Sequence, residues 1–479
     1  MNRAETLVAL TVAPLDVLIV GGGIVGAGIA RDAAMRGLQA GLVEQGDFAS
    51  GTSSRSSRLL HGGLRYLAQG RLGLVHEASR EKKIIHHIAP HLAGPLPFLF
   101  PAYRSNPNWR LWQLKIGVKL YDLLCGGKNF AASAWLTPEE CLQQVPGLCA
   151  ENLVGAVRYY DGLTNDARLV LDTLCSAADH GARLLNYCRF RDASRNSFWA
   201  CELEDTMAGR KLSVRARVVV NASGSWADGL PHSSVKLRLT KGVHLVVDRR
   251  RLSAPDAVVM PEGKRILFAI PWGERTILGT TDTDYWGRPE DVRPEPADIR
   301  YVLEIANRYF PGVGLAEHDV ISSWAGLRPL LANPAGAPSD ISREHKIHSP
   351  EPGWWDVAGG KLTTYRLMAE QTVDQIVRAL KTSKALDREV APCRTAMEQL
   401  LVSPPQFSGL APPEFCRQAV QKFCANEWAV HLGDVMIRRT SWQHYFPESR
   451  ERAIQVADWM RDILGWTEKI RAEEIAHYL

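Results

Sequence analysis

The feature that most constrains the fold is an apolar run that ends in a glycine-rich turn. Residues 16–20 read Asp-Val-Leu-Ile-Val, and Gly21, Gly23 and Gly26 follow with the spacing G-x-G-x-x-G. In a strand–turn–helix unit, the first glycine permits a tight turn, the second lets the backbone approach a pyrophosphate, and the third lets helix and strand pack closely. The free amides and positive dipole of the helix N-terminus also favour phosphate. The spacing therefore indicates a dinucleotide-binding turn.

The segments that follow this turn support the same interpretation. Residues 27–37 are rich in small residues and end at Gly37, which is typical of a closely packed helix that stops at a glycine. A second strand, residues 40–44, ends in Glu44. Glu44 lies roughly 20 residues after Gly21, where such folds place the acid that binds a ribose hydroxyl. The alternative is a strand end at the surface. An acid here disfavours a 2′-phosphate, so NADP is not expected.

Composition limits the class of protein. A chain of 479 residues is long enough for two or three domains. Its net charge of +5 suits a small anionic substrate or an anionic membrane surface, and it is too small to indicate nucleic acid. The nine cysteines form no C-x-x-C pair, which favours free thiols in a reducing compartment, and no metal-ligand spacing is found. No apolar run is long enough for a transmembrane helix. For the N-terminus we expect a short disordered extension rather than a signal peptide.

Three further stretches have the residue types of a cofactor site. Residues 50–58 are rich in serine and run directly into the pattern HGGLRY at residues 61–66. A flexible linker is the alternative, but hydroxyls followed by glycines suit a cradle for phosphates and ring edges. Residues 218–224 predict another strand that enters a small-residue turn. Residues 354–366 predict a strand, a Gly-Gly turn and a long helix. The N-terminus of that helix could stabilise charge on a reduced flavin, although an ordinary β–α unit would look the same.

The remaining segments predict a β-rich stretch over residues 237–285, which could cover a ligand site, and a helix over residues 295–310. Prolines mark a linker within residues 384–415, and the chain beyond it is rich in helix formers.

These stretches resemble those of the FAD-dependent glycerol-3-phosphate dehydrogenase family of the aerobic, quinone-linked type. The similar stretches are GGGIVGAGIARDAA, TSSRSSRLLHGGLRYL, NDARLVL, KGVHLVV, IPWGERTILGTTDTDY, GLRPL and GGKLTTYR. They extend over most of the chain before the linker. HGGLRYL and GGKLTTYR are far more specific than the glycine turn.

The resemblance implies an α/β fold with three parts. The first is an FAD-binding Rossmann-like domain of the glutathione-reductase/D-amino-acid-oxidase type, which we place in residues 12–80, 151–230 and 345–383. The second is a β-rich substrate-binding (cap) domain in residues 81–150 and 231–344. The third is a C-terminal helical domain in residues 384–479.

The resemblance also implies FAD as cofactor and oxidation of sn-glycerol 3-phosphate to dihydroxyacetone phosphate, by hydride transfer from C2 to FAD N5. Electrons would pass to quinone. The protein is then expected to be cytoplasmic and peripheral on the inner face of the cytoplasmic membrane, and a homodimer is one assembly that it allows. The sequence shows no strong amphipathic anchor, so membrane attachment depends on the resemblance alone.

The expected site residues follow from these stretches. Arg328 and Arg343 are candidates for the substrate phosphate, because a planar guanidinium binds two oxygens at once; Arg65 and Tyr66 are expected near the substrate. His61 is the candidate base, with packing against the flavin as an open alternative, and His244 is a weaker candidate. Lys361 could hydrogen-bond the flavin or the substrate hydroxyl. The expected cofactor-binding residues are Gly21, Gly23, Gly26, Glu44, Thr52, Ser53, Ser57, Arg58, His61, Gly62, Ala222, Gly224, Gly359, Gly360, Lys361, Leu362 and Thr363.

Two other functions stay open at this point. A related FAD oxidase of an amine or hydroxy acid, with oxygen as acceptor, would carry the same glycine turn. A non-catalytic FAD-binding protein is the second alternative, and the set of His61, Arg65, Arg328 and Lys361 argues against it.

Overall fold

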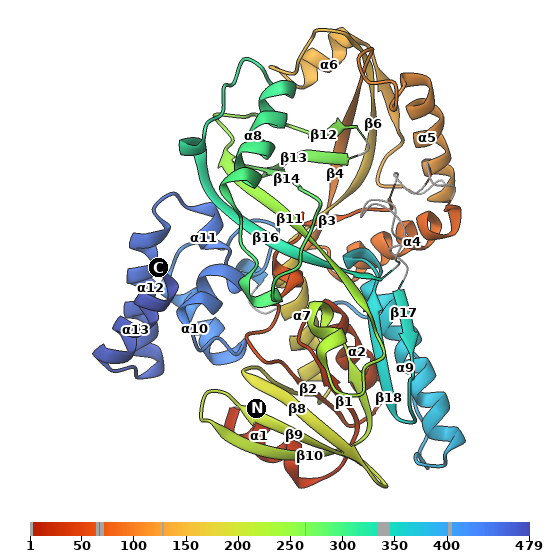
Figure 1. The fold of residues 1–479 in the computed structure, drawn as a ribbon, viewed down its shortest axis with the longest axis vertical. Helices are drawn as coiled ribbons and strands as arrows, with labels where there is room; N and C mark the ends of the chain where they lie inside the picture. Colours follow the sequence, from red (N-terminus) through yellow and green to blue (C-terminus); the bar gives the residue numbers. More distant parts are fainter. Residues whose placement is uncertain are drawn as a thin grey trace.

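Two sheets form the frame of the molecule, and a group of C-terminal helices lies beside them (Figure 1). The computed structural model describes residues 3–63, 67, 71–126, 129–263, 265–332, 345–400 and 405–479. No helix in these ranges is long and apolar enough to cross a bilayer.

The lower sheet in Figure 1 is built around five parallel strands. Every residue of its central strand β1 is buried, as a continuous apolar run predicts for a strand covered on both faces. The strands, in sheet order, are β17 (His345–His348), β18 (Trp354–Gly359), β10 (Arg210–Asn221), β1 (Leu15–Val20), β2 (Ala40–Val43) and β7 (Arg183–Leu185). An antiparallel pair, β8 (Cys188–Arg195) and β9 (Trp199–Asp205), extends from β10.

Three helices pack on this sheet and on one another: α2 (Ile24–Met35), α7 (Asp166–Asp179) and α9 (Tyr365–Thr382). A Cβ at Gly28 of α2 would lie 3.1 Å from Ala369 and from Tyr365, so the small residues of α2 allow α9 to approach closely. The predicted strand–glycine–helix unit of residues 354–366 is present as β18 and α9, with a short 3₁₀ turn, Leu362–Thr364, between them. Both predicted β–α units therefore belong to one sheet.

The upper sheet is mostly antiparallel, with α8 (Pro296–Tyr309) packed over β11, β12 and β14. This confirms the β-rich stretch and the helix that follows it. Its strands, in sheet order, are β15 (Thr283–Asp284), β11 (Leu237–Asp248), β14 (Arg275–Gly279), β13 (Arg265–Trp272), β12 (Ala257–Glu262), β4 (Ala93–Tyr103), β6 (Leu153–Thr164) and β3 (Leu59–Leu60), with β16 (Val320–Leu331) on β11 and β5 (Ala134–Leu136) on β6. The helices α5 (Leu111–Leu124) and α6 (Pro138–Gln144) lie in the same half of the molecule. The helix α4 (Leu72–Ile88) joins the two halves, because Val75 packs into the core of the upper sheet and Ile85 and Ile88 pack into that of the lower one.

The C-terminal region is helical, as predicted, and has its own apolar core that includes Phe423, Val435, Trp442 and Met460. Its elements are α10 (Arg417–Asn426), a π-helical turn (Asp434–Arg439), α11 (Trp442–Tyr445), α12 (Ser449–Leu464) and α13 (Glu468–Tyr478). They lie on the left in Figure 1, against both sheets.

Two expectations differ from the structure. The N-terminal residues form a helix, α1 (Arg3–Val12), rather than a disordered extension, because Leu7 and Leu10 pack into a core and Arg3 donates to the carboxylate of Asp205 at 2.6 Å. The strand β6 pairs with β4 in the upper sheet, although we placed residues 151–164 with the lower one. After β6 the chain returns to the lower sheet at Asn165, which caps α7. The other domain bounds stay a prediction.

Candidate active site

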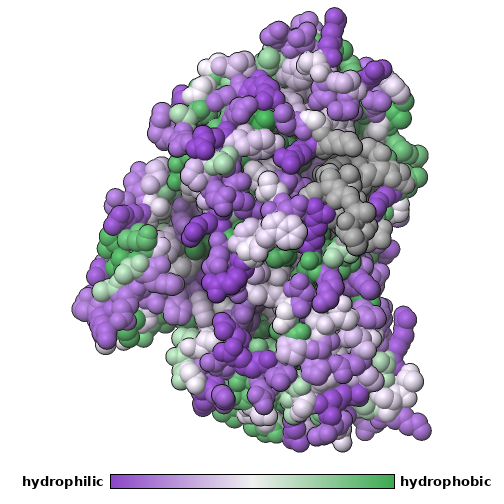
Figure 2. Space-filling model, viewed as in Figure 1, coloured by the Kyte–Doolittle hydropathy of each residue, from purple (hydrophilic) through white to green (hydrophobic). Residues whose placement is uncertain are grey.

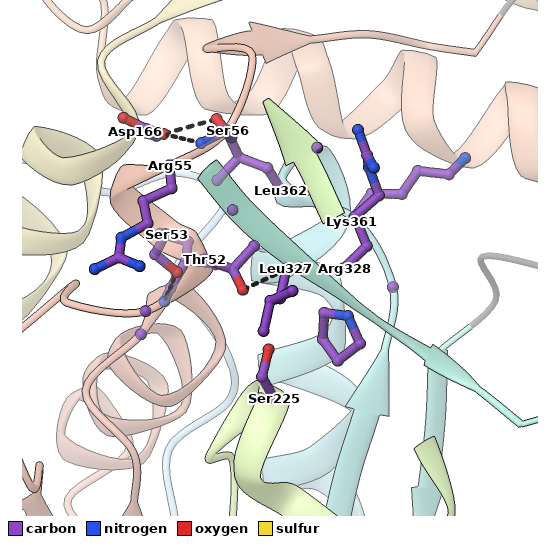
Figure 3. Close-up of a pocket in the computed structure, with 18 of the residues that line it drawn as sticks. Thr52, Ser53, Arg55, Ser56, Asp166, Ser225, Leu327, Arg328, Lys361 and Leu362 are labelled. Carbon is purple, nitrogen blue, oxygen red and sulfur yellow. Dashed lines mark hydrogen bonds between the residues drawn. The ribbon is translucent and has the colours of Figure 1, made fainter. Parts of the chain in front are cut away.

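A cavity of about 430 Å³ is lined by residues of both sheets. One end is formed by the β1–α2 turn and the carboxyl end of β2, which is where open parallel sheets bind their ligands. The other end is formed by β11, β13 and β16 of the upper sheet. Figure 3 shows the polar side chains that reach this space from both sides.

The glycine turn forms a wall made of backbone. Gly21 has a φ of +117°, and a Cβ there would lie 2.5 Å from the carbonyl oxygen of Ala222. Gly23 faces the cavity beside Ser53, whose Oγ accepts a hydrogen bond from the amide of Ile24 at 3.0 Å. A Cβ at Gly26 would lie 1.9 Å from the carbonyl oxygen of Gly21, so this glycine lies behind the wall and allows close packing. The surroundings of Gly21 and Gly26 leave no room for a side chain, and Gly23 opens the backbone to the cavity, which is compatible with the predicted dinucleotide turn.

Glu44 lies at the cavity and is fixed by two backbone amides. Its Oε2 accepts from Gly22 at 2.7 Å and its Oε1 accepts from Gly46 at 2.9 Å. Burial raises the pKa of Glu44, and the two amides partly offset this effect. Each carboxylate oxygen keeps a second acceptor site, so the side chain suits a ribose hydroxyl.

The serine-rich segment joins the two sheets rather than acting as a linker. Thr52 donates to the carbonyl oxygen of Leu327 in β16 at 2.6 Å, and the hydroxyl of Ser56 donates to Asp166 of α7 at 2.7 Å (Figure 3). The hydroxyl of Ser57 lies 2.7 Å from Nε2 of His244. Thr52, Ser53 and Ser57 all line the cavity.

Arg55 also lines the cavity, and the sequence analysis missed it. In the described part of the chain, no carboxylate forms an ion pair with its guanidinium. Burial and the positive charge of Arg438 lower the pKa of Arg55. A half-buried cation that pairs with no carboxylate among the described residues favours an anionic ligand, such as a pyrophosphate. The only signal in the sequence was its position within the serine-rich cradle.

Arg58 does not line the cavity, which corrects the expected cofactor contact. Its side chain is buried, with Cζ 4.2 Å from the ring centroid of Trp272. One guanidinium nitrogen donates to Ser441 of the C-terminal region at 3.0 Å. The cation–π contact and this hydrogen bond hold the side chain away from the cavity.

Two other expected residues lie behind the lining and support it. The amide of Gly62 donates to Tyr121 at 3.1 Å and to Asp161 at 3.2 Å. The hydroxyl of Thr363 accepts from the amide of His61 at 3.1 Å. Neither Gly62 nor Thr363 lines the cavity, so in this geometry they position the neighbouring His61.

Arg328 of β16 lies at the end of the cavity formed by the upper sheet. Its Nη1 donates to Asp282 at 3.2 Å, and its Nη2 donates to the Thr280 hydroxyl at 3.0 Å. A Cβ at Gly242 would lie 2.4 Å from Nη2, so this glycine provides the room for the guanidinium. Figure 3 shows Lys361 at the same space. The expected residues that also line the cavity are His61, Ala222, Gly224, Gly359, Gly360, Lys361 and Leu362. Arg65, Tyr66 and Arg343 lie outside the described residues.

His244 lines the cavity as an uncharged group. Its ring stacks on Trp324 with the centroids 5.2 Å apart. Burial, with the nearby charges of Arg328 and Arg58, lowers the pKa of His244 to about 3. An imidazole with this pKa is poorly matched to proton transfer near neutral pH, which leaves His61 as the better candidate base.

Comparisons with known proteins agree with this site. The sequence profile of the family described as FAD dependent oxidoreductase matches residues 16–375. The chain is 35% identical to glycerol-3-phosphate dehydrogenase 2 of Mycobacterium tuberculosis, over 100% of this chain and 90% of that protein. It is 38% identical to the aerobic glycerol-3-phosphate dehydrogenase of Staphylococcus epidermidis, over 78% of this chain and 69% of the relative. This chain belongs to the glycerol-3-phosphate dehydrogenase family of FAD-dependent oxidoreductases.

A solved structure of the same family has the same fold. The X-ray structure of glycerol-3-phosphate dehydrogenase from Bacillus halodurans, complexed with FAD, matches with a TM-score of 0.79 and 28% identity. The match covers 99% of this chain and 96% of that one. The predicted family, fold class and cofactor are thus confirmed.

FAD is the cofactor, and the residues of the cavity fit it. The turn at Gly21 and Gly23 leaves no side chain between the backbone and a pyrophosphate, and Arg55 offers a positive charge. Glu44 is placed for ribose hydroxyls. The turn at Gly359 and Gly360, where both φ angles are positive, leads to Lys361 and Leu362 on the cavity wall. All of these residues line one continuous cavity.

Proposed function

We propose that this flavoprotein oxidises sn-glycerol 3-phosphate to dihydroxyacetone phosphate. The observation that carries the proposal is the position of Arg328, whose guanidinium lies in the same cavity as the dinucleotide turn, at the end formed by the upper sheet. The relatives named glycerol-3-phosphate dehydrogenase, which match 78% to 100% of this chain, support this substrate.

The reaction removes a hydride from C2 and a proton from the C2 hydroxyl. Bound FAD supplies the hydride acceptor. Arg328 binds the phosphate and thereby orients C2, since a guanidinium can hold two phosphate oxygens. His61 accepts the hydroxyl proton, and Lys361 hydrogen-bonds the substrate oxygen or the flavin. Arg65, Tyr66 and Arg343 are proposed as further substrate contacts.

Aromatic side chains in the cavity wall strengthen phosphate binding. Phe98, Phe100, Tyr159 and Phe268 line the cavity near the upper sheet. Such walls lower the local dielectric, so an ion pair between Arg328 and a phosphate is stronger there than in water. They also exclude water from the alcohol.

For the electron acceptor, we propose a quinone at a membrane surface. The support is the exposed face of α5, where Trp112, Ile116 and Leu123 are 58%, 61% and 71% exposed. The nearby Trp135 is 55% exposed and lies under Lys115 and Lys119. In Figure 2, apolar side chains gather along the upper right edge, where Figure 1 places α5. Exposed tryptophans beside lysines suit an anionic membrane interface.

Leu114, Val118 and Tyr121 are buried on the inner face of α5. Because apolar residues occur on both faces of this helix, only burial in the structure separates the exposed face from the buried one. The homodimer stays a prediction.

An acceptor assay tests the function and separates it from the related oxidases. The purified enzyme is mixed with glycerol 3-phosphate, glycine or a hydroxy acid, with either oxygen or a soluble quinone analogue as acceptor. The proposal requires quinone reduction with glycerol 3-phosphate and little peroxide. Peroxide formation with glycine or a hydroxy acid would instead support the alternative oxidase.

A further inference from the structure

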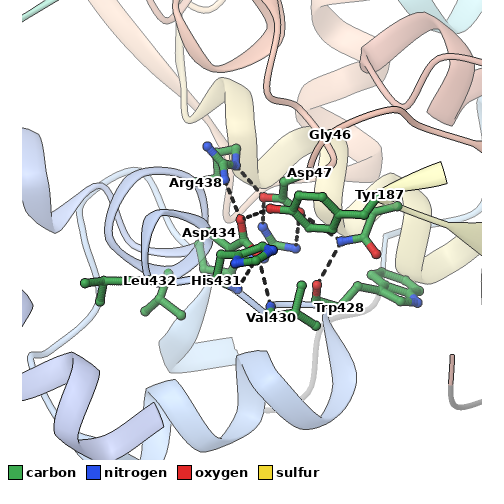
Figure 4. Close-up of polar contacts among 12 residues, drawn as sticks. Gly46, Asp47, Tyr187, Trp428, Val430, His431, Leu432, Asp434 and Arg438 are labelled. Atoms are coloured by element: carbon green, nitrogen blue, oxygen red, sulfur yellow. Dashed lines mark hydrogen bonds and ion pairs between the residues drawn. The ribbon is translucent and has the colours of Figure 1, made fainter. Parts of the chain in front are cut away.

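A buried cluster of charges joins the C-terminal region to the loop that follows β2. Asp47, in this loop, is buried and accepts hydrogen bonds from Arg438 and Arg439 of the π-helical turn (Figure 4). The Nη2 of Arg439 lies 2.9 Å from Oδ1 of Asp47, and the Nδ2 of Asn186 lies 3.2 Å from the same oxygen. The carboxylate is thus held from two sides.

Asp434 completes the cluster on the C-terminal side. It accepts from the Tyr187 hydroxyl and from Arg438, both at 2.6 Å (Figure 4). The amides of Val430 and His431 each donate to its other oxygen at 2.9 Å. Two carboxylates therefore face two guanidiniums. Burial would raise the pKa of Asp47, but Arg439 and Arg438 outweigh it and lower the pKa, so this carboxylate stays ionised.

The loop held by this cluster is the one that positions Glu44. The amide of Gly46 donates to Glu44 at 2.9 Å, and the amide of Ala49 donates to the carbonyl oxygen of Gly22 at 3.0 Å. Phe48 packs edge-on against Trp428 of the C-terminal region, with the centroids 5.3 Å apart. A Cβ at Gly22 would lie 2.6 Å from the Phe48 ring, so the loop also backs the glycine turn. Residues 44–49 thus contact the C-terminal region on one side and support Glu44 and the glycine turn on the other.

We propose that the C-terminal helical region is a clamp for the adenosine half of FAD. Arg438, Arg439 and Trp428 hold residues 44–49 in the conformation that presents Glu44 and the Gly21–Gly23 turn to the cofactor. They are positioning residues, because Asp47 and Phe48 transmit their effect and none of them lines the cavity. FAD affinity therefore depends on a region outside the FAD-binding family match, which ends at residue 375.

The chain offers a matched control in a second buried ion pair. Arg168 of α7 lies 2.5 Å from Glu427 of the C-terminal region, and both side chains are buried. This pair also joins the two regions, but its side chains make no contact with residues 44–49 among the interactions of the described residues. Arg439 donates to the backbone carbonyl oxygen of Glu427, which Glu427→Gln leaves in place. Glu427→Gln therefore weakens the same interface without touching the loop.

The test is a titration of deflavinated protein with FAD and, separately, with ADP as a probe of the adenosine half. We expect Asp47→Asn to raise the Kd for both ligands by about 10-fold or more, since it removes charge-assisted hydrogen bonds that fix the loop. Glu427→Gln should lower thermal stability about as much as Asp47→Asn does, but it should change either Kd by less than about 3-fold. Saturating FAD should restore the activity of Asp47→Asn, which mere structural damage would not allow.

Arg439→Lys is the second variant if Asp47→Asn does not fold, because it keeps the charge and loses the forked hydrogen bonds. It should weaken FAD and ADP binding in the same direction. Unchanged Kd values in the folded variant, or equal losses in Glu427→Gln, would overturn the proposal. Since no substrate is present in the titration, its outcome is independent of whether glycerol 3-phosphate is oxidised.

Discussion

The guanidinium of Arg328 lies 3.2 Å from the carboxylate of Asp282, on the wall of the cavity that also holds the dinucleotide turn. The same side chain donates to the hydroxyl of Thr280 and the carbonyl oxygen of Thr281. These contacts fix its orientation before any substrate arrives. A preorganised cation of this kind loses little side-chain entropy when it binds a phosphate.

We expect Arg328→Ala to raise the KM for glycerol 3-phosphate by about 10- to 100-fold, because it removes charge-assisted hydrogen bonds to the phosphate. Its FAD content should stay unchanged. Steady-state kinetics with absorbance of bound flavin measure both. Arg288→Ala is the control, since Arg288 is exposed and pairs with Asp291 outside the cavity lining. Normal kinetics in Arg328→Ala would remove the phosphate assignment.

His61→Asn should slow flavin reduction by about 100-fold or more, since general-base catalysis contributes effects of this size. The reduction rate should also lose the pH dependence that arises from titration of the base. Anaerobic stopped-flow measurements across pH 5 to 9 (a range about the ordinary pKa of histidine) check both points. If the rate and its pH profile are retained, His61 is not the base.

The lowered pKa of His244 makes stability depend on pH. Its pKa in the folded protein is about 3, against 6.5 when unfolded. Between these values only the unfolded state binds the proton, so stability is lost as pH falls below 6.5. From pH 6.5 to 5 the loss is about 2 kcal/mol, at roughly 1.4 kcal/mol per pH unit.

His244→Gln should therefore show a smaller drop in urea midpoint between pH 6.5 and 5 than the unmodified enzyme. Exposed His318→Gln is the control and should retain the full drop. An identical pH dependence in all three proteins would show that the buried imidazole has no such effect.

Gly21→Ala should yield protein that lacks bound flavin, because its φ of +117° and the contact at 2.5 Å leave no room for a Cβ. Gly117→Ala in α5 is the matched control, since a Cβ there meets nothing within 4 Å. It should bind FAD normally and be slightly more stable, by up to about 1 kcal/mol. Absorbance of the purified proteins near 450 nm (roughly the flavin maximum) measures the difference. Yellow Gly21→Ala protein would contradict the assigned turn.

The dinucleotide site was predictable because its signals are local. The spacing of Gly21, Gly23 and Gly26 encodes one turn, and Glu44 follows after a single helix and strand, so no distant contact is needed to place it. The helices near residues 296 and 365 also followed from local sequence patterns, whereas the fold class followed from the resemblance of several stretches to one family.

Arg55 and Arg58 could not be told apart from local sequence patterns. Both lie in the same serine-rich stretch, and Arg58 was the expected cofactor contact. Its side chain is instead held by Trp272 and Ser441, which are distant in sequence, while Arg55 faces the cavity. Which of two neighbouring arginines reaches a cofactor depends on such tertiary contacts. The cluster around Asp47 was missed for the same reason.

The most direct test of the proposed substrate is anaerobic reduction of the bound flavin by a panel of alcohols. Glycerol 3-phosphate should bleach the flavin, while glycerol should bleach it far more slowly, and Arg328→Ala should lose most of this discrimination. The proposal would be contradicted if glycerol 3-phosphate left the flavin oxidised, or if glycine or glycerol bleached it equally fast. Either result would show that Arg328 does not select a phosphorylated substrate.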